Sequence, residues 1–243
     1  MAKVMIVTGG GRGIGAATAR LAARRGYKVC VNYARDRASA ESLAREIGGI
    51  AVQADVAVEA DVLKLFRETD ERLGRLGVLV NNAGIVDRAA RVEELSLARI
   101  ERMFAVNVTG SILCAREAVK RMSTRHGGEG GSIVNLSSVA ARLGAPEQYV
   151  DYAAAKGAID VFTVGLAKEV GGEGIRVNAV RPGVIKTEIH ASGGQPGRAE
   201  RVGATAPLKR AGEPEEIAAA ILWLASDEAS YVSGAILDVA GGR

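Results

Sequence analysis

Proline and cysteine are both scarce in this chain of 243 residues, which has five prolines and two cysteines. Because no proline-rich stretch, low-complexity run or repeat of solenoid period stands out, nothing marks a linker between domains. Cys30 and Cys114 lie among apolar residues without Cys-x-x-Cys spacing, which indicates buried thiols and not a disulfide. No cluster of His, Cys, Asp and Glu has metal-ligand spacing. We therefore expect one domain over residues 1–243, with no metal site.

Long apolar runs are missing as well. No stretch reaches the length needed to cross a membrane, and the first residues, MAKVMIVTGG, run straight into a strand-like segment without the regions of a signal peptide. The net charge is +4, but the 32 basic and 28 acidic residues are interspersed, which argues against a nucleic-acid partner. We expect a soluble, cytoplasmic protein that binds neither nucleic acid nor membrane.

The chain does have a regular alternation of apolar runs and helical patterns. Segments such as 15–26 and 215–227 have apolar residues three and four apart, as in amphipathic helices. This order predicts an α/β fold, with one Rossmann-type, doubly wound parallel sheet of about seven strands and helices on both faces. Ligands bind such a sheet beyond the carboxyl ends of its strands. The predicted strands, all rich in Val and Ile, are 3–9, 28–33, 49–56, 76–84, 131–138, 175–183 and 235–242.

The first predicted strand is followed by TGGGRGIG, residues 8–15, and then by a predicted helix. Glycines at this place let the backbone turn tightly and let a pyrophosphate approach the helix N-terminus, where free N–H groups favour negative charge. Gly9, Gly13 and Gly15 therefore predict a dinucleotide-binding turn. The alternative is a strand-to-helix turn with a structural role alone.

The end of the second predicted strand, VNYARD, bears on the choice of dinucleotide. Folds of this type commonly place an acidic residue here to bind the adenosine ribose, whereas Tyr33 occupies the position and Arg35 follows. Together with Arg12 from the glycine turn, Arg35 suits a 2'-phosphate, which guanidinium groups bind through charge-assisted hydrogen bonds. We expect NADP(H) as the preferred cofactor. Asp36 keeps NAD(H) possible, and the alternative for the two arginines is a solvated surface position.

The glycine turn is the first of five motifs that occur in a fixed order. The others are NNAG (81–84), NLSS (135–138), YAAAK (152–156) and RPG (181–183). Over residues 3–242 the chain therefore resembles the short-chain dehydrogenase/reductase family in its compact form. It looks most similar to bacterial NADP-type members of the 3-oxoacyl-carrier-protein reductase and sugar dehydrogenase-like kind. The resemblance implies a small carbonyl or alcohol substrate and a homotetramer, with residues 231–242 at an interface.

The resemblance also implies roles for individual residues. Asn107, Ser138, Tyr152 and Lys156 match the catalytic set, in which the asparagine holds a water of a proton relay. The segments that follow the third, fourth and sixth predicted strands match those that contact adenine, line the cofactor and meet the nicotinamide, respectively. With the residues of the glycine turn and the second strand, the expected cofactor-binding residues are Gly9, Arg12, Gly13, Ile14, Gly15, Tyr33, Arg35, Asp55, Val56, Asn82, Ala83, Gly84, Tyr152, Lys156, Pro182, Gly183, Ile185 and Thr187.

The chemistry of carbonyl reduction explains why these residue types occur together. Hydride transfer leaves negative charge on the carbonyl oxygen, which must be stabilised and protonated. Tyr152 becomes a usable acid if a nearby ammonium group lowers its pKa from about 10, and Lys156 lies four residues on, hence on the same helix face. Ser138 can donate its hydroxyl to the same oxygen, and motif register favours it over Ser137. The alternative is a half-buried Tyr–Lys pair without chemistry.

Several features around this set leave alternatives open. Ser138 and Tyr152 are 14 residues apart, slightly more than in many family members, so we expect altered substrate contacts with the same chemistry. Residues 187–212 are polar and rich in glycine, which predicts a substrate lid. His190 faces either the substrate or solvent. Tyr149 and Asp151 either line the pocket or lie in a surface loop.

The leading functional prediction is an NADP(H)-dependent reductase of a 3-oxoacyl thioester or a small ketone. A sugar or polyol dehydrogenase on the same site is the alternative within the enzyme class. A nucleotide-binding regulator without catalytic activity is the alternative from another class, because a fold does not by itself determine function.

Overall fold

A parallel β-sheet forms the centre of the protein in a computed structural model that describes residues 3–243, except the side chains of residues 190 and 192. Within these residues, seven strands pair in the order β3-β2-β1-β4-β5-β6-β7, and every pairing is parallel. The strands are β1 (Val4–Val7), β2 (Lys28–Tyr33), β3 (Ile50–Gln53), β4 (Leu76–Asn81), β5 (Gly131–Leu136), β6 (Ile175–Pro182) and β7 (Ile236–Val239).

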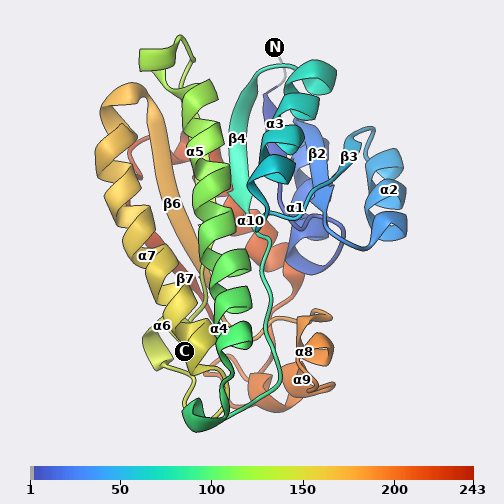
Figure 1. Cartoon of the computed structure of the whole chain (residues 1–243), viewed down its shortest axis with the longest axis vertical. Coiled ribbons are helices and arrows are strands. Elements are labelled where there is room, and N and C mark those ends of the chain that lie inside the picture. Colours follow the sequence, from blue (N-terminus) through green and yellow to red (C-terminus); the bar gives the residue numbers. More distant parts are fainter. Residues whose placement is uncertain (1–2) are drawn as a thin grey trace.

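Helices cover both faces of the sheet (Figure 1). They are α1 (Gly13–Arg24), α2 (Arg37–Glu46), α3 (Glu59–Leu73), α4 (Leu97–Phe104), α5 (Gly110–Met122), α6 (Ala140–Leu143), α7 (Val150–Val170), α8 (Ile189–Ser192), α9 (Arg198–Gly203) and α10 (Pro214–Ala225). One face packs on α1, α2 and α10, and the other on α3, α5 and α7. The predicted doubly wound α/β fold is confirmed.

Strand β1 illustrates why the strands are apolar throughout. All four of its residues are buried, with Val4 and Ile6 in the core on one face and Met5 and Val7 in the core on the other. A strand covered on both sides has no solvent-facing positions, so its sequence does not alternate between apolar and polar residues. The cysteines lie in the same two-sided core. Both are free and buried, and burial raises the pKa of each thiol to about 12.

The predicted strands are confirmed in place, but several of them are longer than the observed ones. The predicted strand 49–56 ends at Gln53, 76–84 ends at Asn81, and 235–242 ends at Val239. The residues that follow these ends are mostly polar or glycine, and they leave the sheet as loops. The difference places the expected ligand-binding residues just beyond the sheet, where loops are free to contact a ligand.

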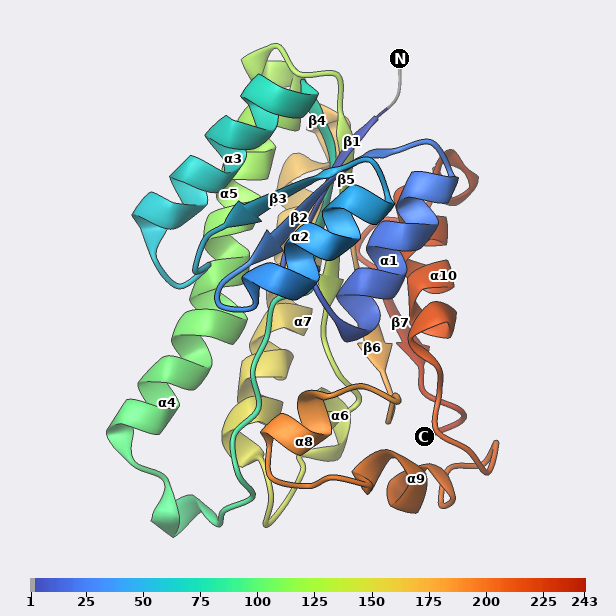
Figure 2. The same ribbon diagram turned by 90° about the vertical axis from the view of Figure 1, so that its right-hand side faces the viewer.

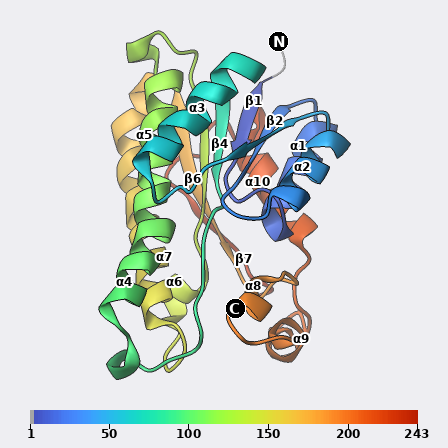
Figure 3. The same ribbon diagram turned by 45° about the vertical axis from the view of Figure 1, so that its right-hand side comes forward.

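The loops after β1, β4, β5 and β6 lie toward one end of the molecule. Figures 2 and 3 show α4, α6, α8 and α9 gathered at this end, away from the start of β1. Among the described residues, no helix combines the length and the apolar character that a membrane span requires.

Candidate active site

The glycine turn (residues 8–15) is held in shape by two asparagine side chains from neighbouring strands. Asn32, in β2, accepts a hydrogen bond from the Gly9 amide at Oδ1 (3.1 Å) and donates from Nδ2 to the carbonyl of Ala54 (2.9 Å). Asn82, after β4, donates from Nδ2 to the carbonyls of Thr8 (2.8 Å) and Gly9 (3.0 Å). The turn is therefore fixed from both sides by neutral amides, without a charged side chain.

Side chains are excluded from the turn by close backbone contacts. A Cβ atom at Gly15 would lie 2.6 Å from both the Gly9 carbonyl oxygen and Nδ2 of Asn82. Gly13 has a φ of +52°, and a Cβ atom there would lie 3.1 Å from Cγ2 of Thr187, which follows β6. Glycine is therefore the residue that fits at both positions, at the N-terminus of α1, where backbone amides without a helical partner favour a phosphate group.

The expected ribose end of the cofactor site has two exposed arginines and one carboxylate that already has a partner. Tyr33 is buried at the end of β2, whereas Arg12 and Arg35 are exposed. Asp36 caps α2 by accepting a hydrogen bond from the Ser39 amide (3.1 Å). The side chain of Ser39, then its amide and to a smaller extent Arg12, lower the pKa of the Asp36 carboxyl group. Among the ion pairs of the described residues, none joins the guanidinium group of Arg12 or Arg35 to a carboxylate within 4 Å.

The remaining expected cofactor residues line the same end of the sheet. Asp55 and Val56 follow β3, and Asp55 accepts a hydrogen bond from the amide of Ala57 (3.0 Å). The segment 82–84 follows β4. Pro182 is the last residue of β6, and the residues up to Thr187 follow that strand. The structure therefore brings residues from five strands to one edge.

Tyr152 and Lys156 lie one turn apart on α7, as their spacing predicts. Nζ of Lys156 is 5.7 Å from the centre of the Tyr152 ring and donates a hydrogen bond to the carbonyl of Leu136 at the end of β5 (2.6 Å). The Lys156 residue is only 4% exposed. The lysine therefore joins α7 to the strand that precedes Ser138.

The pKa of Tyr152 does not follow our expectation that the ammonium group would lower it. Burial raises the pKa of the phenol, and a hydrogen bond with the Ser138 side chain opposes the rise. The amine lies over the ring and is bound to a backbone carbonyl, so desolvation of the phenolate is the larger effect. Tyr152 therefore keeps its proton at neutral pH.

The two neighbouring serines have different surroundings. Ser138 is partly exposed; its Oγ accepts a hydrogen bond from the amide of Ala140 (3.1 Å), and its side chain contacts Tyr152. Ser137 is buried and donates its hydroxyl to the carbonyl of Lys156 (3.2 Å). Ser137 thus anchors α7 to β5, whereas Ser138 faces the phenol.

A buried carboxylate that the sequence reasoning missed lies behind Lys156. Burial lowers the pKa of Lys156 to about 8, and the carboxylate of Asp160, one turn further along α7, opposes this effect. Asp160 accepts hydrogen bonds at Oδ2 from Nε (3.0 Å) and Nη2 (2.8 Å) of Arg181 in β6. Its Oδ1 is buried without a partner among the described residues. The four-residue spacing from Lys156 was the available signal.

Asn107 occupies a π-helical turn, Ala105–Thr109, between α4 and α5, and such turns are frequent at functional sites. Its side chain accepts a hydrogen bond from the amide of Ile85 (3.0 Å) and donates to the carbonyls of Ile85 (3.0 Å) and Met103 (3.1 Å). At Gly84 a Cβ atom would lie 2.7 Å from Oδ1 of Asn107 and 3.6 Å from Nζ of Lys156. Asn107 therefore holds the segment after β4 beside Lys156.

Tyr149 and Asp151 are both buried, so the surface-loop alternative is wrong for them. Asp151 accepts hydrogen bonds from Nε (2.8 Å) and Nη2 (3.2 Å) of Arg99 in α4. Tyr149 accepts one at its hydroxyl from Nε2 of Gln195 (2.9 Å), which belongs to the expected lid. The side chain of His190 lies outside the described residues.

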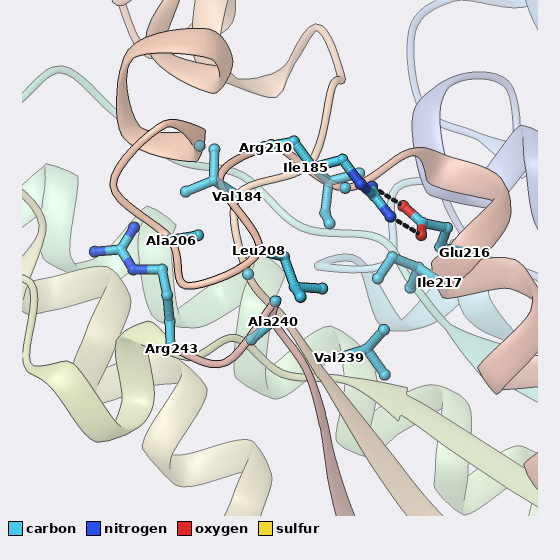
Figure 4. A pocket seen from close by; sticks show the side chains of 14 residues that line it. Val184, Ile185, Ala206, Leu208, Arg210, Glu216, Ile217, Val239, Ala240 and Arg243 are labelled. Carbon is cyan, nitrogen blue, oxygen red and sulfur yellow. Dashed lines mark hydrogen bonds and ion pairs between the residues drawn. The ribbon is translucent and has the colours of Figure 1, made fainter.

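The expected lid, 187–212, contains α8 and α9 and is fixed at its carboxyl end by Arg210, whose guanidinium pairs with Glu216 (2.7 Å). Figure 4 shows this pair at one side of a cavity of about 110 Å³, with Val184, Ile185 and Leu208 around it. The cavity lies between the end of the lid and the carboxyl ends of β6 and β7. Its lining includes Gly183 and Ile185, two of the expected cofactor residues, but not Tyr152.

Comparison with known proteins gives a consistent result. The family model described as enoyl-(acyl carrier protein) reductase matches residues 9–243. The uncharacterized oxidoreductase YgfF of Escherichia coli K12 is 54% identical over 99% of both chains. The 3-oxoacyl-[acyl-carrier-protein] reductase of Synechocystis sp. is 40% identical over 99% of this chain and 96% of the relative. Glucose 1-dehydrogenase 2 of Bacillus subtilis is 38% identical over 99% of this chain and 94% of the relative.

A solved structure agrees in fold over nearly the whole chain. The crystal structure titled ribose-5-phosphate isomerase from Brucella melitensis 16M has a TM-score of 0.91 and 34% sequence identity, and the match covers 99% of this chain and 92% of that chain. Because the family match and the relatives extend over almost all of the sequence, the chain belongs to the short-chain dehydrogenase/reductase family of oxidoreductases, which act on carbonyl and alcohol groups with nicotinamide cofactors.

Proposed function

We propose that the protein is an NADP(H)-dependent carbonyl reductase, reversible as a secondary-alcohol dehydrogenase, in which Tyr152 is the acid and base. The observation that carries the proposal is the contact between Tyr152 and Ser138 beside the buried Lys156, beyond the end of β5. A bound nicotinamide supplies the hydride in reduction and accepts it in oxidation. The residues of the chain position the carbonyl and handle the proton.

In the proposed reduction, Ser138 donates its hydroxyl hydrogen to the carbonyl oxygen and stabilises the charge that develops there. Tyr152, which burial keeps protonated, gives its proton to that oxygen and becomes a phenolate. Lys156 stabilises the phenolate and holds the cofactor ribose. Asn107 keeps the neighbouring backbone in place. Oxidation of an alcohol follows the same steps in reverse.

The proposed preference for NADP(H) rests on Arg12 and Arg35. Both are exposed at the end of the sheet where the adenosine ribose would bind, and the nearest acidic residue, Asp36, is engaged in capping α2. A 2'-phosphate would supply the partner that these guanidinium groups lack. The glycine turn would hold the pyrophosphate through the first amides of α1.

For the substrate we propose a 3-oxoacyl thioester or a small ketone, enclosed by residues 187–212 as a lid. The relative named 3-oxoacyl-[acyl-carrier-protein] reductase supports this choice. The relative named glucose 1-dehydrogenase supports a sugar or polyol as the second candidate.

We also propose a homotetramer with residues 231–242 at an interface. In support, β7 lies at an edge of the sheet, and the side chain of Tyr231 is fully exposed. Sedimentation of the full chain measures the assembly directly.

The test of the proposed function is an initial-rate panel with the purified full chain. NADPH and NADH are compared with an acetoacetyl thioester, simple ketones and quinones, and sugars and polyols are assayed in the oxidative direction. We expect turnover of at least one ketone with a higher kcat/KM for NADPH. Absence of NADPH binding, or of turnover with every carbonyl and alcohol, would contradict the proposal.

A further inference from the structure

Three arginines, Arg88, Arg198 and Arg201, which we call the arginine cluster, lie on segments that contact one another where the lid meets the start of α7. Oε1 of Gln195 accepts hydrogen bonds from Nη1 of Arg198 (3.0 Å) and from Nη2 of Arg201 (3.2 Å). Nε2 of the same amide donates to the hydroxyl of Tyr149, and the guanidinium carbon of Arg198 lies 5.4 Å from the Tyr149 ring centre. A neutral amide thus gathers two cations against a buried tyrosine.

Arg88 approaches the lid from the segment that follows β4. At Gly194, a Cβ atom would lie 3.6 Å from Cγ of Arg88, so the two segments are in contact. The carbonyl of Arg88 accepts a hydrogen bond from Nη1 of Arg99 (2.7 Å), and Arg99 is itself paired with the buried Asp151. The backbone of Arg88 is therefore fixed, while its side chain remains exposed beside the lid.

The guanidinium groups of the arginine cluster form no ion pair within the described residues, although the carboxylate of Asp87 accepts a hydrogen bond from the Arg88 amide (2.7 Å). Among residues 3–243, the ion pairs within 4 Å include Arg91 with Glu93 and Arg210 with Glu216, but none of the three cluster residues. The pKa of Lys186 is raised mainly by Glu213 and to a smaller extent by Glu200, which lies on α9. Like charges that gather without a counterion repel one another, and a bound anion relieves that repulsion.

One member of the arginine cluster, Arg198, packs on a tyrosine that is close in sequence to the proposed proton donor. Tyr149, against which Arg198 packs, immediately precedes α7, and Tyr152 follows three residues later. Tyr149 is the N-cap residue of α7, and Tyr152 lies in the first turn of that helix. Figures 1 and 2 show α8 and α9 at the same end of the molecule as the start of α7. An anion on the arginine cluster can therefore belong to the molecule whose carbonyl meets Tyr152.

Building on the proposed function, we infer that the substrate is a short carbonyl compound, or its alcohol, that carries an anionic group a few bonds from the reacting carbon. The arginine cluster binds that group, and the lid closes over it. Guanidinium groups bind carboxylate and phosphate alike, through paired charge-assisted hydrogen bonds. The shared chemistry is thus an oxyanion, which comes either as a carboxylate or as a phosphate monoester.

The test uses pairs of ketones that differ only in this charge. Acetoacetate is compared with methyl acetoacetate, and dihydroxyacetone phosphate with dihydroxyacetone, as substrates of the full chain with NADPH. We expect kcat/KM to be higher for the charged member of one pair by about tenfold or more, and the pair that responds identifies carboxylate or phosphate.

Two variants, R198Q and R88Q, locate the effect, and R67Q in α3 is the matched control far from the lid. In R198Q we expect KM for the preferred charged ketone to rise about tenfold, while kcat and the KM of its neutral partner change less than about twofold. R67Q should behave like the unmodified chain. Equal or better turnover of both neutral members, or equal losses for charged and neutral ketones in R198Q, would overturn the inference.

A binding measurement separates this inference from the proposed function. Calorimetry of the four compounds with the chain and NADP⁺ reports affinity without turnover. If no ketone reacts but a charged member binds at least about tenfold more tightly than its neutral partner, the proposed function fails and the anion site stands. If ketones react without any preference in rate or affinity for the charged members, the proposed function stands and the anion site fails.

Discussion

The glycine turn and the α7 face that carries Tyr152 and Lys156 lie at the same end of the sheet, but they are built on different physical principles. The turn is shaped by neutral amides and by backbone contacts that leave no room for a Cβ atom at Gly15. The α7 face relies on charged groups in buried surroundings, where Lys156 and Asp160 act on each other. The first region is thus defined by its shape, and the second by its charges. Changes of volume and changes of charge should therefore have different consequences in the two regions.

The largest effect is expected on the α7 face, from removal of one hydroxyl in Y152F. Without the proposed proton donor, kcat should fall by about 10²–10⁴-fold, since this is the usual contribution of a general acid. The affinity for NADPH should stay within about twofold, because the turn is untouched. Initial rates and fluorescence titration measure the two quantities. Y149F is the control: it removes a hydroxyl that contacts the lid and should retain most of kcat. Retention of more than about a tenth of kcat in Y152F would contradict the role of Tyr152.

The converse experiment changes shape without charge. In G15A, the new Cβ atom meets the Gly9 carbonyl and the Asn82 side chain at 2.6 Å, so the turn must move. We expect the dissociation constant of NADPH to rise about tenfold to a hundredfold. G165A in α7 is the control, because nothing lies within 4 Å of a Cβ atom there. It should raise stability by about 0.5–1 kcal/mol without changing cofactor affinity. Unchanged binding in G15A would show that the turn does not require its shape.

The two regions also differ in how much of each could be predicted from the sequence. The glycine turn, the strands and the Tyr152–Lys156 spacing depend on residues close together in the chain, so their patterns were sufficient. The pair of Asp160 with Arg181 joins residues 21 positions apart. Such contacts depend on how helices and strands pack, and no local pattern specifies them. The predicted lowering of the Tyr152 pKa was wrong for the same reason: burial raises this pKa, and burial is a property of the packed structure.

At the ribose end of the cofactor site, charge should also affect binding, but only the binding of a cofactor that carries a 2'-phosphate. R12A and R35A should each raise the dissociation constant of NADPH about tenfold, since each removes one charge-assisted contact to a 2'-phosphate. NADH, which lacks that phosphate, should bind as before. R37A is the control, because Arg37 is exposed nearby and lies 3.8 Å from Glu41. Equal losses for NADPH and NADH would mean that the arginines support the fold and not the phosphate.

The smallest expected effect tests whether charge alone acts on the α7 face. D160N keeps the shape of the side chain but removes the carboxylate that raises the pKa of Lys156, and it leaves the Arg181 cation nearby. The loss of the carboxylate and the remaining positive charge both disfavour the ammonium form, so the pKa of Lys156 should fall below its value of about 8. The ammonium is then lost at lower pH, and the alkaline limb of the kcat profile should move down by up to about one unit. D151N is the control. It removes another carboxylate of α7, which is paired with Arg99 of α4, and it should leave the alkaline limb in place. A limb that stays fixed or moves upward in D160N would mean that Asp160 supports the packing of β6 and α7 without tuning the lysine.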